Sequence, residues 1–124
     1  MTKQEYILEG NKLIALSPFG NLHKDMYNKW FNENNIFVAY NESEFKYHLS
    51  YTWLMPAWFK AMTWYTKEFR LMTSTFEISN LGIIIKSTSS NSFKYARTIF
   101  NEDNYLNDIF EALVEFIKWY NINK

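Results

Sequence analysis

Residues 73–86, TSTFEISNLGIIIK, decide the fold class of this chain. Both halves of the stretch are rich in β-branched and aromatic side chains, which is typical of strands. Ser79 and Asn80, between the halves, are a candidate two-residue turn. A third strand is expected over 93–100, after a hydroxyl-rich loop. Because these connections are too short for parallel crossovers, the three strands predict an antiparallel meander.

In the sequence, segments with helical periodicity precede and follow this meander. After it, a nearly continuous apolar stripe predicts a helix that begins at Asp103 or Asn104, either of which is a good N-cap. Before it, a second helix is expected to begin near Leu54 and to place Pro56 in its first turn, where the missing N–H costs nothing. We therefore predict an α+β fold, a small antiparallel sheet flanked by helices in a helix–sheet–helix sandwich. The stripe after the meander comprises Leu106, Ile109, Phe110, Leu113, Val114, Ile117 and Tyr120.

The amino-terminal part carries weaker signals. Residues 2–9 are expected to form a short helix, with Thr2 as its N-cap, Glu5 completing a capping box and Gly10 as its stop. Further short elements are expected as a strand over 12–16, a helix over 26–31 and a strand over 36–40.

Composition excludes several kinds of protein. With 124 residues, the whole chain, residues 1–124, is expected to be one domain. It has no cysteine, which rules out disulfides and thiolate chemistry. Its formal net charge is zero, which argues against long nucleic acid as a partner. No apolar run is long enough for a membrane span or a signal peptide, so we expect a cytoplasmic protein.

No catalytic or metal-binding motif is recognisable. His23 and His48 are the only histidines, and neither is followed three or four residues later by the acidic or histidine partner of a metal-binding helix. The glycines are isolated from one another, which excludes a glycine-rich phosphate loop. We expect a non-enzymatic protein without a metal or a cofactor.

The stretch YHLSYTWLMP, residues 47–56, concentrates groups that stack and hydrogen-bond. Aromatic residues make up 20% of the chain, more than a small core easily absorbs, so some rings should line a groove or an interface. A base stacked on such a ring gains about 1–3 kcal/mol, and an attached phosphate needs cationic donors. An ordinary structural role is the alternative for each candidate; for His48 it is a hydrogen bond that orders the chain before the helix. The candidate ligand-binding residues are Tyr47, Tyr51 and Trp53 for stacking, His48 and Ser50 for hydrogen bonds, and Arg70 and Arg97 for phosphate.

The same stretch carries a family resemblance. Tyr47 and His48, followed by WLMP at 53–56, resemble a YHxSWxWLMPV signature of small uncharacterised proteins from phages and Bacteroidota. Residues 9–15 and 112–121 resemble the first and last segments of those proteins. Tyr51 and Ala57 depart from the Trp and Val of the signature. The proteins look akin to the phage ABA-sandwich domain, which implies a helix, sheet, helix arrangement.

The resemblance also implies a function. Small phage accessory proteins often counter host defence, in some cases by holding a nucleotide-derived immune signal in a pocket at a subunit interface. We therefore expect a homo-oligomeric anti-defence protein that sequesters a small nucleotide-like ligand without catalysis, in the cytoplasm of the host cell if a phage encodes it. The alternative is a protein-interaction module that inhibits a host defence protein through an aromatic surface patch.

Overall fold

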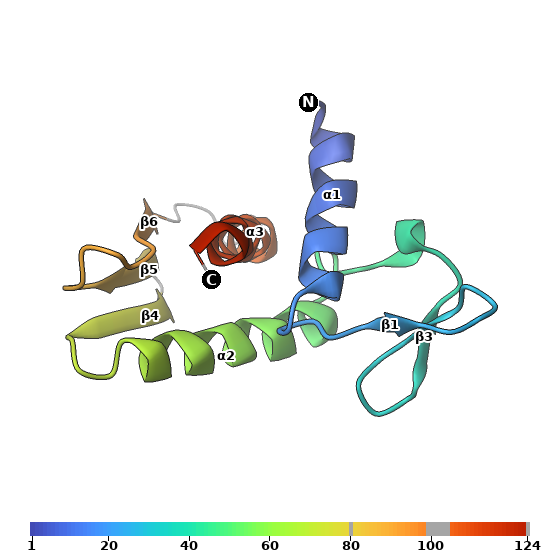
Figure 1. Ribbon diagram of the computed structural model, residues 1–124. Coiled ribbons are helices and arrows are strands. Elements are labelled where there is room, and N and C mark those ends of the chain that lie inside the picture. Colours follow the sequence, from blue (N-terminus) through green and yellow to red (C-terminus); the bar gives the residue numbers. More distant parts are fainter. Residues whose placement is uncertain (80, 99–104, 124) are drawn as a thin grey trace.

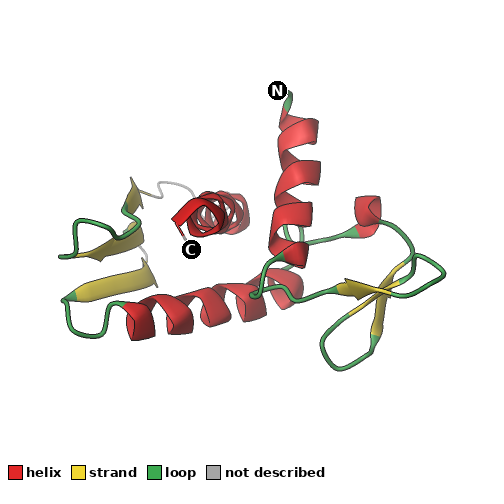
Figure 2. Ribbon diagram, in the orientation of Figure 1, coloured by secondary structure: helices red, strands yellow, loops and turns green. Residues whose placement is uncertain are grey.

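The computed structural model describes residues 1–79, 81–98 and 105–123. The strands in this part of the chain form two separate antiparallel sheets, with the orders β1-β2-β3 and β4-β5-β6. The α+β class is confirmed (Figures 1 and 2). None of the described helices has the length and apolarity that a membrane crossing requires. The elements are α1 (Lys3–Leu16), β1 (His23–Lys24), β2 (Trp30–Phe31), β3 (Phe37–Ala39), the 3-10 helix η1 (Glu42–Glu44), α2 (Tyr51–Glu68), β4 (Ser74–Ser79), β5 (Gly82–Ser87), β6 (Tyr95–Thr98) and α3 (Tyr105–Asn123).

Helix α3 lies at the centre of the fold. Figure 1 shows it almost along its axis, with the β4-β5-β6 sheet on one side, α1 on the other and α2 beneath. The predicted apolar stripe is confirmed, and Ala112 and Phe116 outside that stripe are buried as well. A helix that is apolar on nearly every side needs neighbours on nearly every side. The predicted caps Asp103 and Asn104 lie outside the described residues.

Phe116 lies at the centre of the aromatic core. Its side chain is fully buried, and its ring centroid lies 5.4–6.4 Å from seven other aromatic rings. Edge-to-face and tilted ring pairs at this spacing add about 0.5–1.5 kcal/mol each to the gain from burial. The seven rings belong to Phe19, Trp64, Tyr65, Phe76, Phe93, Trp119 and Tyr120.

The β4-β5-β6 meander is confirmed. Phe76 pairs with Ile85, and Ile85 pairs with half-buried Tyr95, so the side chains that these strands turn to the core share one face. Rings of both α2 and α3 pack on Phe76, which places the two helices against this same face. The opposite face is open and carries exposed Ile84. The predicted turn at Asn80 and strand residues 99–100 lie outside the described residues.

Helix α1 is longer than predicted. Thr2 caps it as expected, because its hydroxyl accepts a hydrogen bond from the Glu5 N–H. Gly10 does not end it, and the strand predicted over 12–16 is wrong. A Cβ atom on Gly10 would lie 2.8 Å from the Phe110 ring and 2.9 Å from Val114, so this glycine lets α1 approach α3 closely. Tertiary packing, not chain termination, explains its position.

Helix α2 begins at Tyr51, one turn before the predicted start. Pro56 therefore lies inside the helix rather than in its first turn. A proline at this position has no N–H to donate to the carbonyl four residues earlier, which belongs to Thr52.

The β1-β2-β3 sheet projects away from the helices and the other sheet (Figure 1). The two turns that connect its strands are each held by a side-chain oxygen that accepts two backbone hydrogen bonds. The side chain of Asp25 accepts hydrogen bonds from the backbone of Tyr27 and Lys29, and Asn28 has a φ of 64°. The second turn repeats this pattern with Asn32 Oδ1, the N–H groups of Asn34 and Ile36, and a φ of 62° at Asn35.

These side-chain turns explain one failed prediction and one confirmed one. The helix expected over 26–31 is wrong, because Asp25 and Asn28 close a turn in the middle of it and Trp30 joins a strand. The strand expected over 36–40 is confirmed as Phe37–Ala39. The sheet is attached to the core through Trp30, which packs edge-on against Phe45 at 5.1 Å.

We expect Phe116→Ala to lower the free energy of unfolding by about 3–5 kcal/mol, because it opens a cavity where seven rings meet. Chemical denaturation monitored by circular dichroism measures the change. Phe59→Ala, at a position 52% exposed on α2, is the matched control and should cost less than about 1 kcal/mol. Equal losses for the two variants would contradict a core organised around Phe116.

Candidate functional site

A pocket of about 360 Å³ opens between three segments of the amino-terminal half. They are the turn that follows α1, the β2–β3 loop, and the first half of α2 with the residues just before it. A volume above about 300 Å³ is in the range of small-molecule sites. Its lining residues are Phe19, Gly20, Leu22, Asn32, Glu33, Asn34, Val38, Tyr47, Thr52, Trp53, Pro56, Ala57 and Lys60.

Tyr47 and Trp53 form the aromatic wall. Their rings meet edge to face, with centroids 5.2 Å apart. Tyr47 is only 3% exposed, yet its hydroxyl makes no hydrogen bond to any described residue. A Cβ atom on Gly20, which also lines the pocket, would lie 2.9 Å from this hydroxyl oxygen. Tyr47 therefore buries its ring at the pocket wall and presents to the pocket a hydroxyl that has no partner among the described residues.

The protonation state of Tyr47 makes it a donor. Burial raises the pKa of its hydroxyl above the ordinary value. The group stays neutral at physiological pH and keeps its proton for an acceptor. A hydroxyl that lines a pocket and has no protein partner can donate a hydrogen bond to a ligand.

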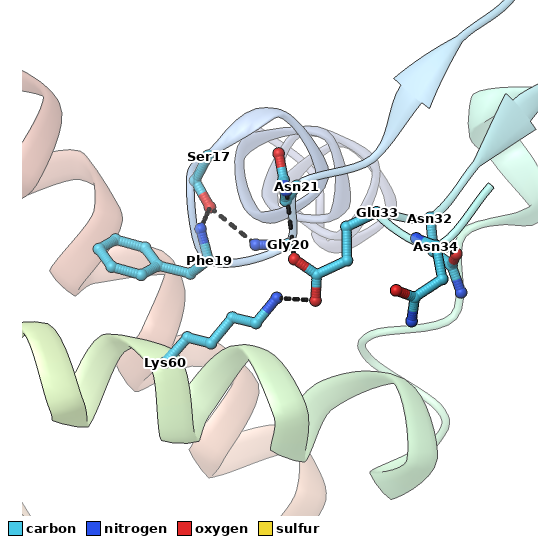
Figure 3. A network of polar contacts seen from close by, with 8 residues as sticks. All are labelled: Ser17, Phe19, Gly20, Asn21, Asn32, Glu33, Asn34 and Lys60. Carbon is cyan, nitrogen blue, oxygen red and sulfur yellow. Dashed lines mark hydrogen bonds and ion pairs between the residues drawn. The ribbon is translucent and has the colours of Figure 1, made fainter. Parts of the chain in front are cut away.

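The turn after α1 is held by one serine (Figure 3). The Ser17 hydroxyl donates to the Ile14 carbonyl at 2.7 Å and accepts from the N–H groups of Phe19 and Gly20. These bonds end the helix and place Phe19 and Gly20 in the pocket wall.

An ion pair spans the pocket from the β2–β3 loop to α2. Lys60 Nζ contacts Glu33 Oε1, and Asn21 Nδ2 donates to Glu33 Oε2 at 3.3 Å (Figure 3). The hydrogen bonds from Lys60 and Asn21 lower the pKa of the Glu33 carboxyl. Glu33 is therefore ionised and offsets the charge of Lys60, so the pocket is close to neutral as a whole.

The rim at α2 offers an acceptor. Thr52 and Pro56 both line the pocket. Because Pro56 cannot donate, the Thr52 carbonyl lacks its usual helical partner. Together with the Tyr47 hydroxyl and the side-chain amide of Asn34, this gives the pocket both donors and acceptors between aromatic and apolar walls.

Of the amino-terminal candidates, Tyr47 and Trp53 line the pocket and the others do not. His48 is directed to α1, where its Nδ1 lies 2.9 Å from Asn11 Nδ2, and its ring packs near Phe110. Ser50 is the N-cap residue of α2, although its side chain makes no capping hydrogen bond. Tyr51 is 49% exposed at the helix start.

The two arginines are not brought to the pocket. Helix α2 has 18 residues and is about 27 Å long; Trp53 lies in its first turn and Arg70 lies beyond its last residue. Arg97 binds two carboxylates of α3, with Nη2 3.2 Å from buried Asp108 Oδ1 and Nη1 in contact with Glu111. Its role in the structure is to tie β6 to α3.

The sequence reading missed Asn34, Glu33 and Lys60. The polar run at 32–35 lies between the helix predicted over 26–31 and the strand predicted over 36–40, and its first three residues line the pocket. Lys60 was detectable, because Trp53, Ala57 and Lys60 follow the spacing of one helical face. No periodicity in the sequence pairs Glu33 with Lys60, since the contact depends on how the β1-β2-β3 sheet meets α2.

Comparisons of the chain with models of known protein families, with curated proteins and with solved structures found no match. Among residues 1–79, 81–98 and 105–123, no group of three or more histidine, aspartate or glutamate side chains is arranged to hold a metal ion. The chemistry of the pocket therefore has to be inferred from its own residues.

We expect Tyr47→Phe to change the free energy of unfolding by less than about 0.5 kcal/mol, because the hydroxyl that it removes has no partner in the protein. Tyr65→Phe is the matched control. The Tyr65 hydroxyl donates to the Phe93 carbonyl at 2.8 Å, so its loss should cost about 1–2 kcal/mol. Urea denaturation of both variants measures the difference. A large loss for Tyr47→Phe would mean that its hydroxyl is already satisfied.

The free energy of unfolding should depend on the protonation of His48. Burial lowers the pKa of His48 in the folded protein, whereas the unfolded chain takes up a proton near the ordinary value of 6.5. The stabilising contribution of the neutral ring is complete above that value and is lost as the pH falls below it.

We expect His48→Gln to reduce the loss of stability between about pH 7.5 and pH 5.5, a window set by the ordinary histidine pKa. Denaturant titrations at both pH values measure it, and His23→Gln, at an exposed position, controls for the loss of an imidazole. An unchanged pH dependence in the His48 variant would contradict the burial effect.

Proposed function

We propose that the protein binds and sequesters a small nucleotide-derived molecule without catalysis, with the base in the pocket beside Tyr47 and Trp53. The observation that carries this proposal is the Tyr47 hydroxyl, which has no partner among the described residues and lies at the wall of an aromatic pocket. A ligand with an acceptor at that point would gain a hydrogen bond that no described protein group takes up.

The walls of the pocket are suited to a planar, neutral group. Trp53 is half-buried and supplies the accessible ring on which a base would gain about 1–3 kcal/mol by stacking, whereas Tyr47 and Phe19 are buried behind the wall. The Tyr47 hydroxyl and the Thr52 carbonyl supply one donor and one acceptor. The edge of a nucleobase presents the complementary pair of groups.

The two arginines that the sequence predicts as phosphate ligands do not line the pocket beside Tyr47. Arg70 is too far along α2, and Arg97 is engaged by Asp108 and Glu111. Lys60 is the one cation among the described residues that line the pocket, and Glu33 already pairs with it. A ligand phosphate would have to displace Glu33, so base and sugar should supply most of the affinity.

A role in countering host defence and a homo-oligomeric state remain part of the proposal. They rest on the resemblance of residues 47–56 to small phage proteins. An apolar groove of about 550 Å³ beside α1, lined by Leu8, Leu13 and Leu16, supports self-association, because Leu8 and Leu16 expose their side chains there.

A second function is supported by the outer aromatic row, which we define as His23, Phe31, Phe37 and Tyr40. Consecutive rings in this row have centroids 6.1, 6.0 and 4.8 Å apart across the projecting β1-β2-β3 sheet. Phe37 is 42% exposed and Tyr40 is 63% exposed. Exposed aromatic side chains are frequent anchors of protein interfaces, so this row supports inhibition of a host defence protein.

Native mass spectrometry of the purified protein with nucleosides, cyclic nucleotides and ADP-ribose derivatives tests the primary proposal. We expect a gain of one ligand mass per pocket, and a dissociation constant raised about three- to tenfold by Tyr47→Phe, which removes one hydrogen bond. Tyr27→Phe, at an exposed position outside the pocket, is the control. Absence of binding across the panel, with a host protein co-purifying instead, would contradict sequestration and favour the outer aromatic row.

A further inference from the structure

A second hollow, of about 630 Å³, lies where the carboxyl ends of two helices meet the β5–β6 loop. Helix α2 contributes Trp64 and Glu68, which are one turn apart on the same face, and Phe69 follows directly. Helix α3 contributes Trp119 and Asn123, also one turn apart. It shares no lining residue with the pocket beside Tyr47.

Aromatic rings inclined to one another form its walls. The Trp64 and Trp119 centroids are 6.1 Å apart with an interplanar angle of 62°, and Phe69 lies 6.4 Å from Trp119. Trp64 and Trp119 are both half-buried, so part of each indole remains accessible. Indole faces carry the most negative quadrupole of the protein side chains and attract cations.

The one charged residue among the described residues that line this hollow is acidic. The Glu68 carboxylate lines it, is exposed and takes part in no hydrogen bond or ion pair with the described residues. The described part of α3 and all of α2 end here, and the carbonyl groups of helix ends carry partial negative charge. Among the described residues that line the hollow, none is a lysine or an arginine.

Cations lie beside the hollow but not among its described lining residues. Lys67 and Arg70 line an adjoining hollow that shares Trp64, Glu68, Phe69 and Ser89 with this one. Lys94 is held by the β5–β6 loop, with its Nζ 2.9 Å from the Ser89 carbonyl.

We propose that the hollow between Trp64, Trp119 and Glu68 binds a small organic cation of the quaternary or methylated ammonium class. Such a cation is too weakly hydrated to need water and too bulky for a close ion pair, so it gains from indole faces together with a nearby carboxylate. The site is independent of the pocket beside Tyr47.

Titration with choline, followed in two-dimensional proton–nitrogen spectra, tests the proposal. The five tryptophans of the chain give separate indole signals. We expect saturable shifts of the Trp64 and Trp119 signals, and no shift of Trp30 or Trp58, which are buried elsewhere. A neutral alcohol with a tert-butyl group in place of the trimethylammonium should produce much weaker shifts at equal concentration.

Glu68→Gln is the decisive variant, because Glu68 is exposed and its loss should not disturb folding. We expect it to weaken choline binding about three- to tenfold, as for a surface carboxylate that faces a cation. Glu77→Gln, on the open face of the sheet, is the matched control and should bind as the wild type does. Tyr47→Phe should also bind choline normally, which separates this site from the nucleotide proposal.

Three results would overturn the inference. Equal shifts with choline and the neutral alcohol would show an apolar hollow without preference for charge. An unchanged affinity in Glu68→Gln would remove the carboxylate from the site. Shifts of Trp64 and Trp119 with inorganic phosphate and not with choline would assign the region to an anion held by Lys67 and Arg70.

Discussion

The burial of helix α3 on nearly every side is the constraint on which the rest of the structure depends. Phe116 needs rings from α2, from the β4-β5-β6 sheet and from the turn after α1 to fill the space around it. Gly10 lets α1 pack close enough to cover the far side. With α3 enclosed, the β1-β2-β3 sheet has no place in the core and projects from it, attached through Trp30 and Phe45.

Both hollows follow from this arrangement, because each lies where the packing around α3 ends. The pocket beside Tyr47 forms where the turn after α1 and the projecting sheet meet the start of α2. The hollow beside Trp64 and Trp119 forms at the other end of α2, beyond the rings that surround Phe116. Rings that begin in the core thus continue to the surface, where polar groups from loops and helix ends stand beside them.

The arrangement of charge distinguishes the two places. In the first pocket, Glu33 and Lys60 offset one another, which suits a neutral group with hydrogen-bonding edges. In the second, Glu68 makes no ion pair with the described residues and lies beside two helix ends, which suits a positive charge. Arg97 was a candidate for binding phosphate. It differs from Glu68 because its charge is already paired within the fold, with Asp108 and Glu111.

The sequence by itself determined the α+β class, the β4-β5-β6 meander and the stripe of α3, because strand alternation and helical periodicity are local signals. Only the tertiary structure decided that Gly10 lies within a helix, that 26–31 contains a turn and a strand, and that Lys60 meets Glu33. It also separated Arg70 and Arg97 from Tyr47. These features depend on tertiary contacts and on side-chain hydrogen bonds in turns. The close packing of α1 on α3 and the hydrogen bonds of Asp25 and Asn32 outweigh the local propensity of the segments.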